Sequence, residues 1–431
     1  MIKIIQADGT AELAAIERLA GRGAGSGEAG ASEIDAAVRA IIDDVRIRGD
    51  AAVREYGEKF DGFVPERREY GRTDMKVAFD AADENFSGAL LRAAENIRRY
   101  HEAQKISGYE HRDEAGNVLG QIVRGLDRVG IYVPGGTAAY PSTVLMNAIP
   151  AKIAGVGEIV MVTPPGADGV SRDILTAAWI AGVDRIIAAG GAQAVAALAY
   201  GTETIPRVDK IVGPGNVYVA TAKRMVYGVV DIDMIAGPSE ILVIADGGAE
   251  PKFIAADMLS QAEHDVRSAA MLVTTDIRIA ERTAEEIERQ LALLCRSEFA
   301  RKAIRENGLI IIARSDDEAV ALANLAAPEH LEIMTDDPLE ALPFIRNAGS
   351  VFLGPWSPEP LGDYYAGTNH VLPTSGTARF ASPLGVYDFV KRMSYTLYTE
   401  ESLRRAKDDI VCIGEKEGLT AHTEAVKIRF R

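Results

Sequence analysis

Cysteine is scarce in this chain, and its scarcity excludes two kinds of structure. Only Cys295 and Cys412 occur among 431 residues. Two cysteines cannot build a disulfide framework or a cysteine-rich zinc site. We therefore expect a reducing, cytoplasmic compartment.

Long apolar runs and an excess of positive charge are also missing. No apolar stretch reaches the roughly 20 residues that span a bilayer. The first residues carry early acids and no long apolar core, so they do not predict a signal peptide. The formal net charge of -16 argues against a nucleic-acid partner, because phosphate binding needs clustered cations. We expect neither a membrane nor a nucleic acid as a partner.

What is present is the composition of an ordinary soluble protein, with 47% hydrophobic and 26% charged residues. At roughly 150 residues per domain, the length suggests two or three domains. Strands are predicted at 128–133, 158–163, 184–189 and 209–212, each ending in a glycine-rich turn, and at 240–245, 270–275, 309–313, 331–335 and 350–353. Helices are predicted between them, at 141–155, 172–181, 192–200, 251–264, 278–294, 297–306, 316–326 and 338–347. Buried strands alternating with helices indicate parallel sheets, in which ligands bind beyond the carboxyl ends of the strands.

The remaining segments frame these two α/β halves. Helices are predicted at 32–60 and 80–105 and a short strand at 120–124, whereas the polar stretch 382–427 resembles an appended helical tail. We therefore predict an α/β fold with two Rossmann-like parallel-sheet domains, a helical N-terminal region and a small C-terminal tail domain. The predicted parts are an N-terminal helical arm (1–30, with a glycine-rich hinge at 21–31), a first α/β domain (31–127 and 239–381), a second α/β domain (128–238) and the tail (382–431). The usual G-x-G-x-x-G fingerprint is absent, and no acid follows the first strand, so a dinucleotide site here is not the common Rossmann type.

Four of the six histidines lie after residue 260, each beside acids or glycines. Gln261 and His264 are three residues apart on a predicted helix, so they share a face and could approach one ion. The same spacing also suits an exposed polar helix end, and glutamine is an uncommon zinc ligand. Glu329 and His330 pair an acid with an imidazole between a helix and a strand, which suits proton transfer. The alternative for this pair is a helix C-terminus that carries a favourable cation.

Two later segments add candidates. Residues 362–374 (GDYYAGTNHVLPT) place Asp363 and His370 in one predicted loop, and loops on rigid scaffolds often carry function. Glu417 and His422 lie in the tail, which cannot bury much by itself and could point at another subunit. From the residues alone, we predict an α/β enzyme that depends on a metal.

Several long stretches match one known family in the correct order. They are VRIRGDAAVREYGEKFD, RVGIYVPGG, GGAQAVAALAYGTE, VDKIVGPGN, AGPSEILVIAD, LSQAEH, PEHLEI, GSVFLGPWSPE, GDYYAGTNHVLPT and LTAHTEAV. Along nearly its whole length, the chain resembles histidinol dehydrogenases. The resemblance implies oxidation of L-histidinol through L-histidinaldehyde to L-histidine, in the last steps of histidine biosynthesis, with two NAD and one zinc per subunit.

The resemblance also assigns roles to residues. It implies that zinc is held by four residues that also contact the substrate, Gln261, His264, Asp363 and His422. The implied catalytic acid and base are Glu329 and His330, and further substrate contacts come from Ser239, His330, His370 and Glu417. The implied NAD contacts are Tyr132, Gln193 and Asn216. It further implies a homodimer with shared active sites, in which the tail completes the site of the partner subunit. Neither cysteine lies in a matching motif, so we expect no cysteine nucleophile.

A few positions depart from the family pattern. Ile235 stands where proline is usual, and His264-Asp265-Val266 and residues 382–388 also differ from commoner versions. We expect these changes to affect local geometry and not the zinc ligands.

Three functions are alternatives to that of a histidinol dehydrogenase. They are a related dehydrogenase for another primary alcohol, a catalytically silent binding protein, and a zinc hydrolase without NAD.

Overall fold

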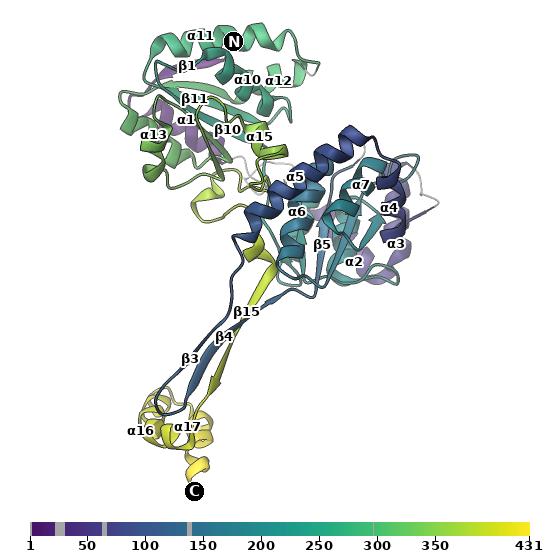
Figure 1. The fold of residues 1–431 in the computed structure, drawn as a ribbon, viewed down its shortest axis with the longest axis vertical. Coiled ribbons are helices and arrows are strands. Elements are labelled where there is room, and N and C mark those ends of the chain that lie inside the picture. The colour runs from purple at the N-terminus through teal and green to yellow at the C-terminus, as the bar shows by residue number, and fades with distance from the viewer. Residues whose placement is uncertain (1, 22–30, 63–66, 136–139, 296) are drawn as a thin grey trace.

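The computed structural model describes residues 2–21, 31–62, 67–135, 140–295 and 297–431. Two α/β bodies lie side by side, and a long β arm carries two helices away from them (Figure 1). The two bodies are called domain I and domain II below. The predicted α/β class with two parallel-sheet domains is confirmed.

Domain I has a six-stranded, wholly parallel sheet in the order β1-β12-β11-β10-β13-β14. Its strands are β1 (Lys3–Gln6), β10 (Glu240–Ala245), β11 (Ala269–Thr274), β12 (Gly308–Ile312), β13 (His330–Met334) and β14 (Ser350–Leu353). Its helices are α1 (Ala11–Ala20), α10 (Pro251–Ala262), α11 (Ile277–Leu291), α12 (Ser297–Asn307), α13 (Asp316–Ala326) and α14 (Pro338–Ala341). Side chains alternate across a strand, so Ile241 and Val243 pack under α10–α12, whereas Leu242 and Ile244 pack under α1 and α13.

Domain II repeats this layering around a second six-stranded sheet in the order β2-β7-β6-β5-β8-β9, parallel except for β2. Its strands are β2 (Glu69–Gly71), β5 (Arg128–Tyr132), β6 (Glu158–Thr163), β7 (Arg185–Ala188), β8 (Lys210–Val212) and β9 (Asp231–Ile232). Helices α2 (Ala31–Arg48), α3 (Asp50–Asp61), α8 (Gly191–Tyr200) and α9 (Val217–Val226) cover one face. Helices α4 (Arg72–Asp80), α5 (Glu84–Glu102), α6 (Pro141–Ile153) and α7 (Arg172–Ala181) cover the other.

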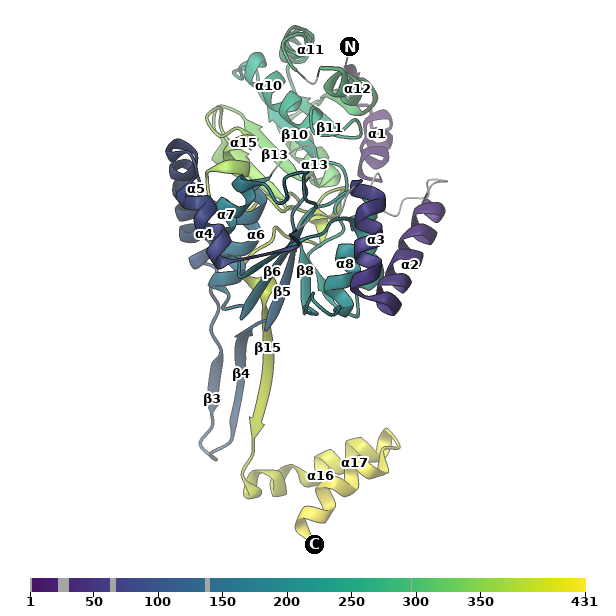
Figure 2. The same ribbon diagram turned by 90° about the vertical axis from the view of Figure 1, so that its right-hand side faces the viewer.

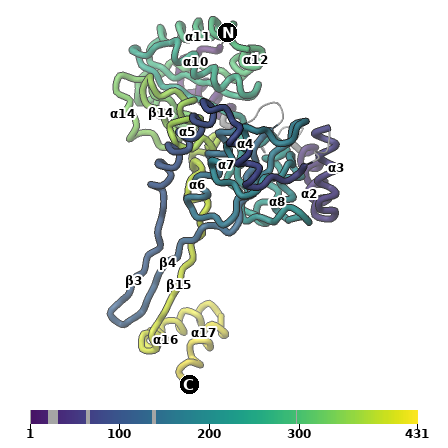
Figure 3. The backbone as a smooth tube through the Cα atoms, turned by 45° about the vertical axis from the view of Figure 1, so that its right-hand side comes forward, coloured from purple at the N-terminus to yellow at the C-terminus, as the bar shows by residue number. Residues whose placement is uncertain are grey.

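The arm is an antiparallel sheet that leaves domain II and ends in the C-terminal helices (Figures 2 and 3). It consists of β3 (Tyr109–Arg112), β4 (Val118–Gly125) and β15 (Val390–Leu397), followed by α16 (Glu400–Lys416) and α17 (Thr420–Lys427). Between domain I and β15, the chain forms α15 (Glu359–Tyr364) and short 3-10 turns. No helix in the described part of the chain is both long and apolar enough to cross a bilayer.

The structure divides the N-terminal third differently from our expectation. Instead of a separate helical arm, β1 and α1 complete domain I, and α2–α5 pack on domain II and not on domain I. An amphipathic pattern shows that a helix has a buried face, but not which sheet covers it. The tail is also only partly helical, because it begins with β15. Most of the predicted hinge at 21–31 lies outside the described residues.

Candidate active site

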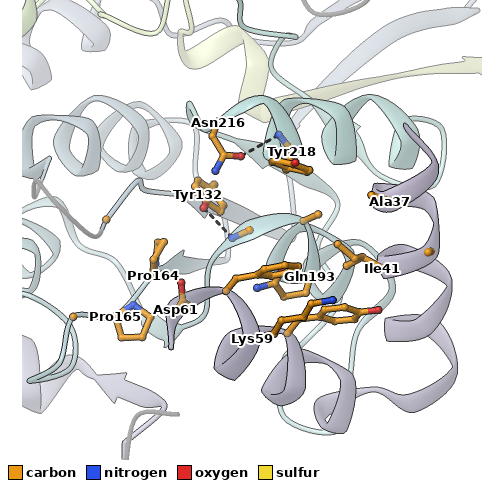
Figure 4. Close-up of a pocket in the computed structure, with 17 residues that line it drawn as sticks. Ala37, Ile41, Lys59, Asp61, Tyr132, Pro164, Pro165, Gln193, Asn216 and Tyr218 are labelled. Atoms are coloured by element: carbon orange, nitrogen blue, oxygen red, sulfur yellow. Dashed lines mark hydrogen bonds between the residues drawn. The ribbon is translucent and has the colours of Figure 1, made fainter. Parts of the chain in front are cut away.

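Two neighbouring cavities hold most of the predicted site residues, one within domain II and one between the two domains. The larger, of about 890 Å³, opens beside the carboxyl ends of the domain II strands (Figure 4). The smaller, of about 310 Å³, lies between the domains and is lined by residues of both. Asn216 lines both cavities, so a molecule in one can approach a molecule in the other.

The larger cavity brings together the three predicted NAD contacts. Tyr132 ends β5, Gln193 lies in the first turn of α8, and Asn216 caps α9 by accepting hydrogen bonds from Tyr218 N and Val219 N at 3.0 and 3.2 Å. Gln193 is 2% exposed, and its Oε1 has no hydrogen-bond partner among the described residues. An unpartnered buried oxygen is costly, so it indicates a site for a donor.

Close backbone approach shapes the same cavity. Gly191 N donates to the Tyr132 hydroxyl at 3.0 Å, and burial raises the pKa of Tyr132 to about 12. A Cβ on Gly135 would stand 2.6 Å from the backbone oxygen of Pro164, and Gly191 has φ +66°, which other residues rarely adopt. The predicted glycine-rich strand ends therefore let the backbone line the cavity.

The smaller cavity collects most of the predicted catalytic and substrate residues. Its lining includes Ser239, His264, Glu329, His330, Asp363 and His370. Ser239 and His330 lie at the amino ends of β10 and β13, in agreement with the predicted strands at 240–245 and 331–335, and not at the carboxyl ends where ligands usually bind in such sheets. The cleft therefore joins the carboxyl edge of one sheet to the amino edge of the other.

His330 is a buried imidazole with a defined tautomer. Its Nδ1 donates to the backbone oxygen of Glu240 at 3.1 Å, because a carbonyl can only accept. The lone pair is then on Nε2, which lies 3.6 Å from Glu359 Oε1. Burial lowers the pKa of His330 to about 4, so the ring is neutral at physiological pH and free to accept a proton.

Glu329 lies on the other side of this imidazole. Its Oε2 accepts from Glu240 N at 3.0 Å and lies 3.7 Å from His330 Nδ1. Burial raises the pKa of Glu329 well above its ordinary value, and the carboxylates of Glu240, Asp363 and Glu359 add to the effect. The alternative of a helix C-terminus that carries a favourable cation is wrong for this pair, because α13 ends at Ala326 and His330 begins β13 as a buried, neutral imidazole.

Three of the four predicted zinc ligands lie near one another. Gln261 is fully buried near the end of α10, its amide nitrogen faces the Glu359 carboxylate, and its Oε1 has no partner among the described residues. His264 lies in the turn just after the helix, at the exposed edge of the smaller cavity. Asp363 belongs to α15 rather than to a loop, and His370 Nδ1 donates to its backbone oxygen at 3.2 Å. The exposed-helix-end alternative is therefore wrong for Gln261.

The chain does not bring its own tail to this site. Glu417 and His422 are exposed on the helices at the end of the arm, far from both cavities (Figure 1). Within one chain, therefore, only three of the four predicted zinc ligands lie at this site.

Sequence reasoning gave no role to Glu359, which the structure places at the centre of the site. It is 2% exposed, and its ligand atom lies within 4.8 Å of those of His330 and Asp363. Burial, reinforced by Asp363, raises the pKa of Glu359 to about 9. Its backbone N donates to the buried Glu332 at 2.8 Å. One feature of the sequence could have pointed to Glu359. It lies four residues before Asp363, and residues four apart share one face of a helix.

Comparisons with known proteins agree with this geometry. The family model described as histidinol dehydrogenase matches residues 26–430. The chain is 56% identical over 401 residues to a histidinol dehydrogenase of Clostridium acetobutylicum, covering 93% of each chain. It is 56% identical over 397 residues to one of Bacillus anthracis, covering 92% of each. The crystal structure of histidinol dehydrogenase from Elizabethkingia anophelis superposes with a TM-score of 0.91 at 37% identity, covering 99% of this chain and 98% of that one.

Proposed function

Because the chain belongs to the histidinol dehydrogenase family, we propose that it oxidises L-histidinol to L-histidine through L-histidinaldehyde, with NAD as oxidant and one zinc ion per subunit. One observation carries this proposal: the neutral, buried imidazole of His330 lies in a cavity that shares Asn216 with a second cavity suited to a dinucleotide. A base and an oxidant site side by side are what an alcohol dehydrogenase requires.

The donor set fits a zinc ion. Gln261, His264 and Asp363 offer amide oxygen, imidazole nitrogen and carboxylate, and the unpartnered Gln261 oxygen would be satisfied by a cation. When bound, the zinc would supply a positive charge that holds the amine and imidazole of the substrate. We infer that the fourth ligand is His422 of a second subunit, in a homodimer with shared sites, because the chain's own His422 is exposed and distant.

The larger cavity fits NAD. Tyr132, Gln193 and Asn216 provide polar contacts, and the glycine turns provide close backbone approach. The nicotinamide supplies the acceptor for each hydride. The remaining chemistry falls to side chains of the smaller cavity.

We assign proton transfer to two residues. His330 would take the hydroxyl proton of histidinol at Nε2 while its Nδ1–H stays bonded to Glu240 O. In the second half, Glu329 would take a proton from the water that attacks the aldehyde carbon, and loss of a second hydride gives the carboxylic acid. Ser239 and His370 line the same cavity and would orient the substrate, joined by Glu417 from the tail of the partner chain.

The scarcity of cysteine supports a cytoplasmic location for the enzyme.

One assay tests the proposal. Purified protein is incubated with NAD and L-histidinol, and NADH and histidine are measured with and without a chelator. We expect NADH and histidine in a two-to-one ratio, loss of activity with chelator, and recovery with zinc. NADH from another primary alcohol but none from histidinol would favour a related dehydrogenase, and histidinol oxidation unaffected by complete zinc removal would refute the zinc assignment.

A further inference from the structure

Asp61 is a carboxylate in the larger cavity that the proposed chemistry does not use. It is the last residue of α3 and lies among Tyr132, Pro164 and Gln193 on the cavity wall (Figure 4). Its side chain is partly buried and makes no hydrogen bond or ion pair with any described residue.

This position is unfavourable for an acid in a purely structural role. Burial raises the pKa of Asp61, which means that the environment disfavours its charge. The residue also ends its helix, where the aligned backbone dipoles carry partial negative charge. The left-handed cap at Gly62 follows it with φ +81° and takes no help from the carboxylate. Arg54 and Arg68 line a small adjacent cavity together with Asp61, but no ion pair or hydrogen bond joins either of them to its carboxylate.

The dinucleotide proposed to bind in this cavity gives a reason for an acid at position 61. In the usual dinucleotide-binding sheet, an acid after a strand accepts hydrogen bonds from a ribose and excludes a phosphate on its 2′-hydroxyl. The strands of domain II that line this cavity end in proline and glycine instead, as at Pro164 and Gly191. Asp61 reaches the same cavity from a covering helix.

The charges of the cavity lining are otherwise sparse. Among the described residues of the lining, Asp61 and Lys59 are the two that carry charge, and Lys59 is exposed, with its Nζ 5.4 Å from the centre of the Phe60 ring. Gln193, whose Oε1 is buried and unpartnered, lines the cavity beside Asp61. Two acceptor groups thus face a space that a hydroxyl-bearing ligand would fill.

We propose that Asp61 selects the coenzyme: its carboxylate accepts hydrogen bonds from the adenosine ribose hydroxyls of NAD and repels the 2′-phosphate of NADP. This inference rests on the proposed NAD-linked function. It adds a specificity residue on α3, outside the strand-end turns that form the rest of the site.

The test uses binding and stability, which do not depend on turnover. Calorimetric titration measures ADP-ribose and 2′-phospho-ADP-ribose binding to the wild-type protein, Asp61→Asn and the control Glu58→Gln, which removes an exposed acid from the same helix outside the cavity lining. We expect the preference for ADP-ribose to fall by about tenfold or more in Asp61→Asn, with Tm unchanged or higher. Glu58→Gln should keep the wild-type preference.

The outcomes separate this inference from the proposed function. An unchanged preference in a folded Asp61→Asn protein overturns the role of Asp61 alone. Failure of both Asp61→Asn and Asp61→Ser to fold would show a structural acid and overturn it too. Wild-type protein that binds neither ADP-ribose nor NAD overturns the coenzyme assignment together with this inference, whatever the variants do.

Discussion

The two domains share one architecture but face the cleft with opposite ends of their sheets. Domain II presents carboxyl ends, where glycine turns and the amide side chains of Gln193 and Asn216 shape a large cavity. Domain I presents amino ends, where His330 and Glu329 are buried together with further carboxyl groups. Under the proposed function, the same fold would supply coenzyme recognition on one side and proton chemistry on the other. Layer architecture alone does not decide what a sheet edge does.

The strongest test of this division is His330→Ala. We expect kcat to fall by about 10²–10⁴-fold, because the alcohol loses its base, while ADP-ribose binding in domain II stays unchanged. His111→Ala is the matched control, since His111 is an exposed histidine on the arm. Steady-state rates and calorimetry measure the two effects. An equal loss of ADP-ribose affinity would show that the domains do not divide the work in this way.

The tail provides a third contribution that can be separated from both domains. His422→Ala should lower activity by about 100-fold, through loss of a metal ligand. Mixing it with the inactive Glu329→Ala should restore about a quarter of wild-type activity, because half of the dimers are mixed and each has one intact site. Verified mixed dimers with no recovery would contradict shared sites.

A change in domain II should affect coenzyme use without affecting chemistry. Gln193→Ala removes the unpartnered buried Oε1 from the larger cavity. We expect the KM for NAD to rise about tenfold, the value of one buried hydrogen bond, with kcat nearly unchanged at saturation. A fall in kcat at full saturation, with KM preserved, would place Gln193 in the chemical step instead.

The smallest expected effect is a displaced pH profile. Glu329 acts as a base only when deprotonated, and its pKa is raised by burial. As the pH falls, the rate of aldehyde oxidation should therefore decline at a higher pH than it would if the base were an exposed glutamate. His330, with a pKa of about 4, should not limit the rate near neutrality. The dependence of kcat/KM for histidinaldehyde on pH measures this decline, which forms the acidic limb of the profile. The Glu329→Gln variant should react slowly and should lack the acidic limb. The same limb in Glu329→Gln would assign it to another group.

Much of the fold could be predicted because most strands of the two sheets are buried on both faces. Segments such as 240–245 and 158–163 are continuous apolar runs, and their predicted bounds match β10 and β6. Strands β1 and β2 escaped prediction because they lie at sheet edges and their residues are exposed or half-buried, so burial leaves no continuous apolar run in their sequences. The strand β15 is almost wholly exposed or half-buried, so burial leaves little pattern in its sequence.

The site was less accessible to sequence reasoning than the fold. Glu329 and His330 stood out as a pair, and the predicted strand at 331–335 puts them at an amino end. Their position opposite the carboxyl edge of the domain II sheet depends on how the two domains pack, which the sequence does not display. Gln261 was singled out by its spacing from His264 and assigned as a zinc ligand only through family resemblance, and its complete burial became visible only in the structure. Glu359 was missed because a single acid after a proline is common, and only packing brings it to His330.

Strand β1 pairs with β12, in a register that joins Lys3 to Leu309. During synthesis at about 5–20 residues per second, this early segment must therefore wait tens of seconds for its partner. Residues of domain II emerge in the interval and can fold first. Closing so long a loop makes this pairing a late and slow event. Domain I is thus sealed at its edge by a strand that is synthesised long before its partner, and until the two pair β12 has an open edge to which other chains can add.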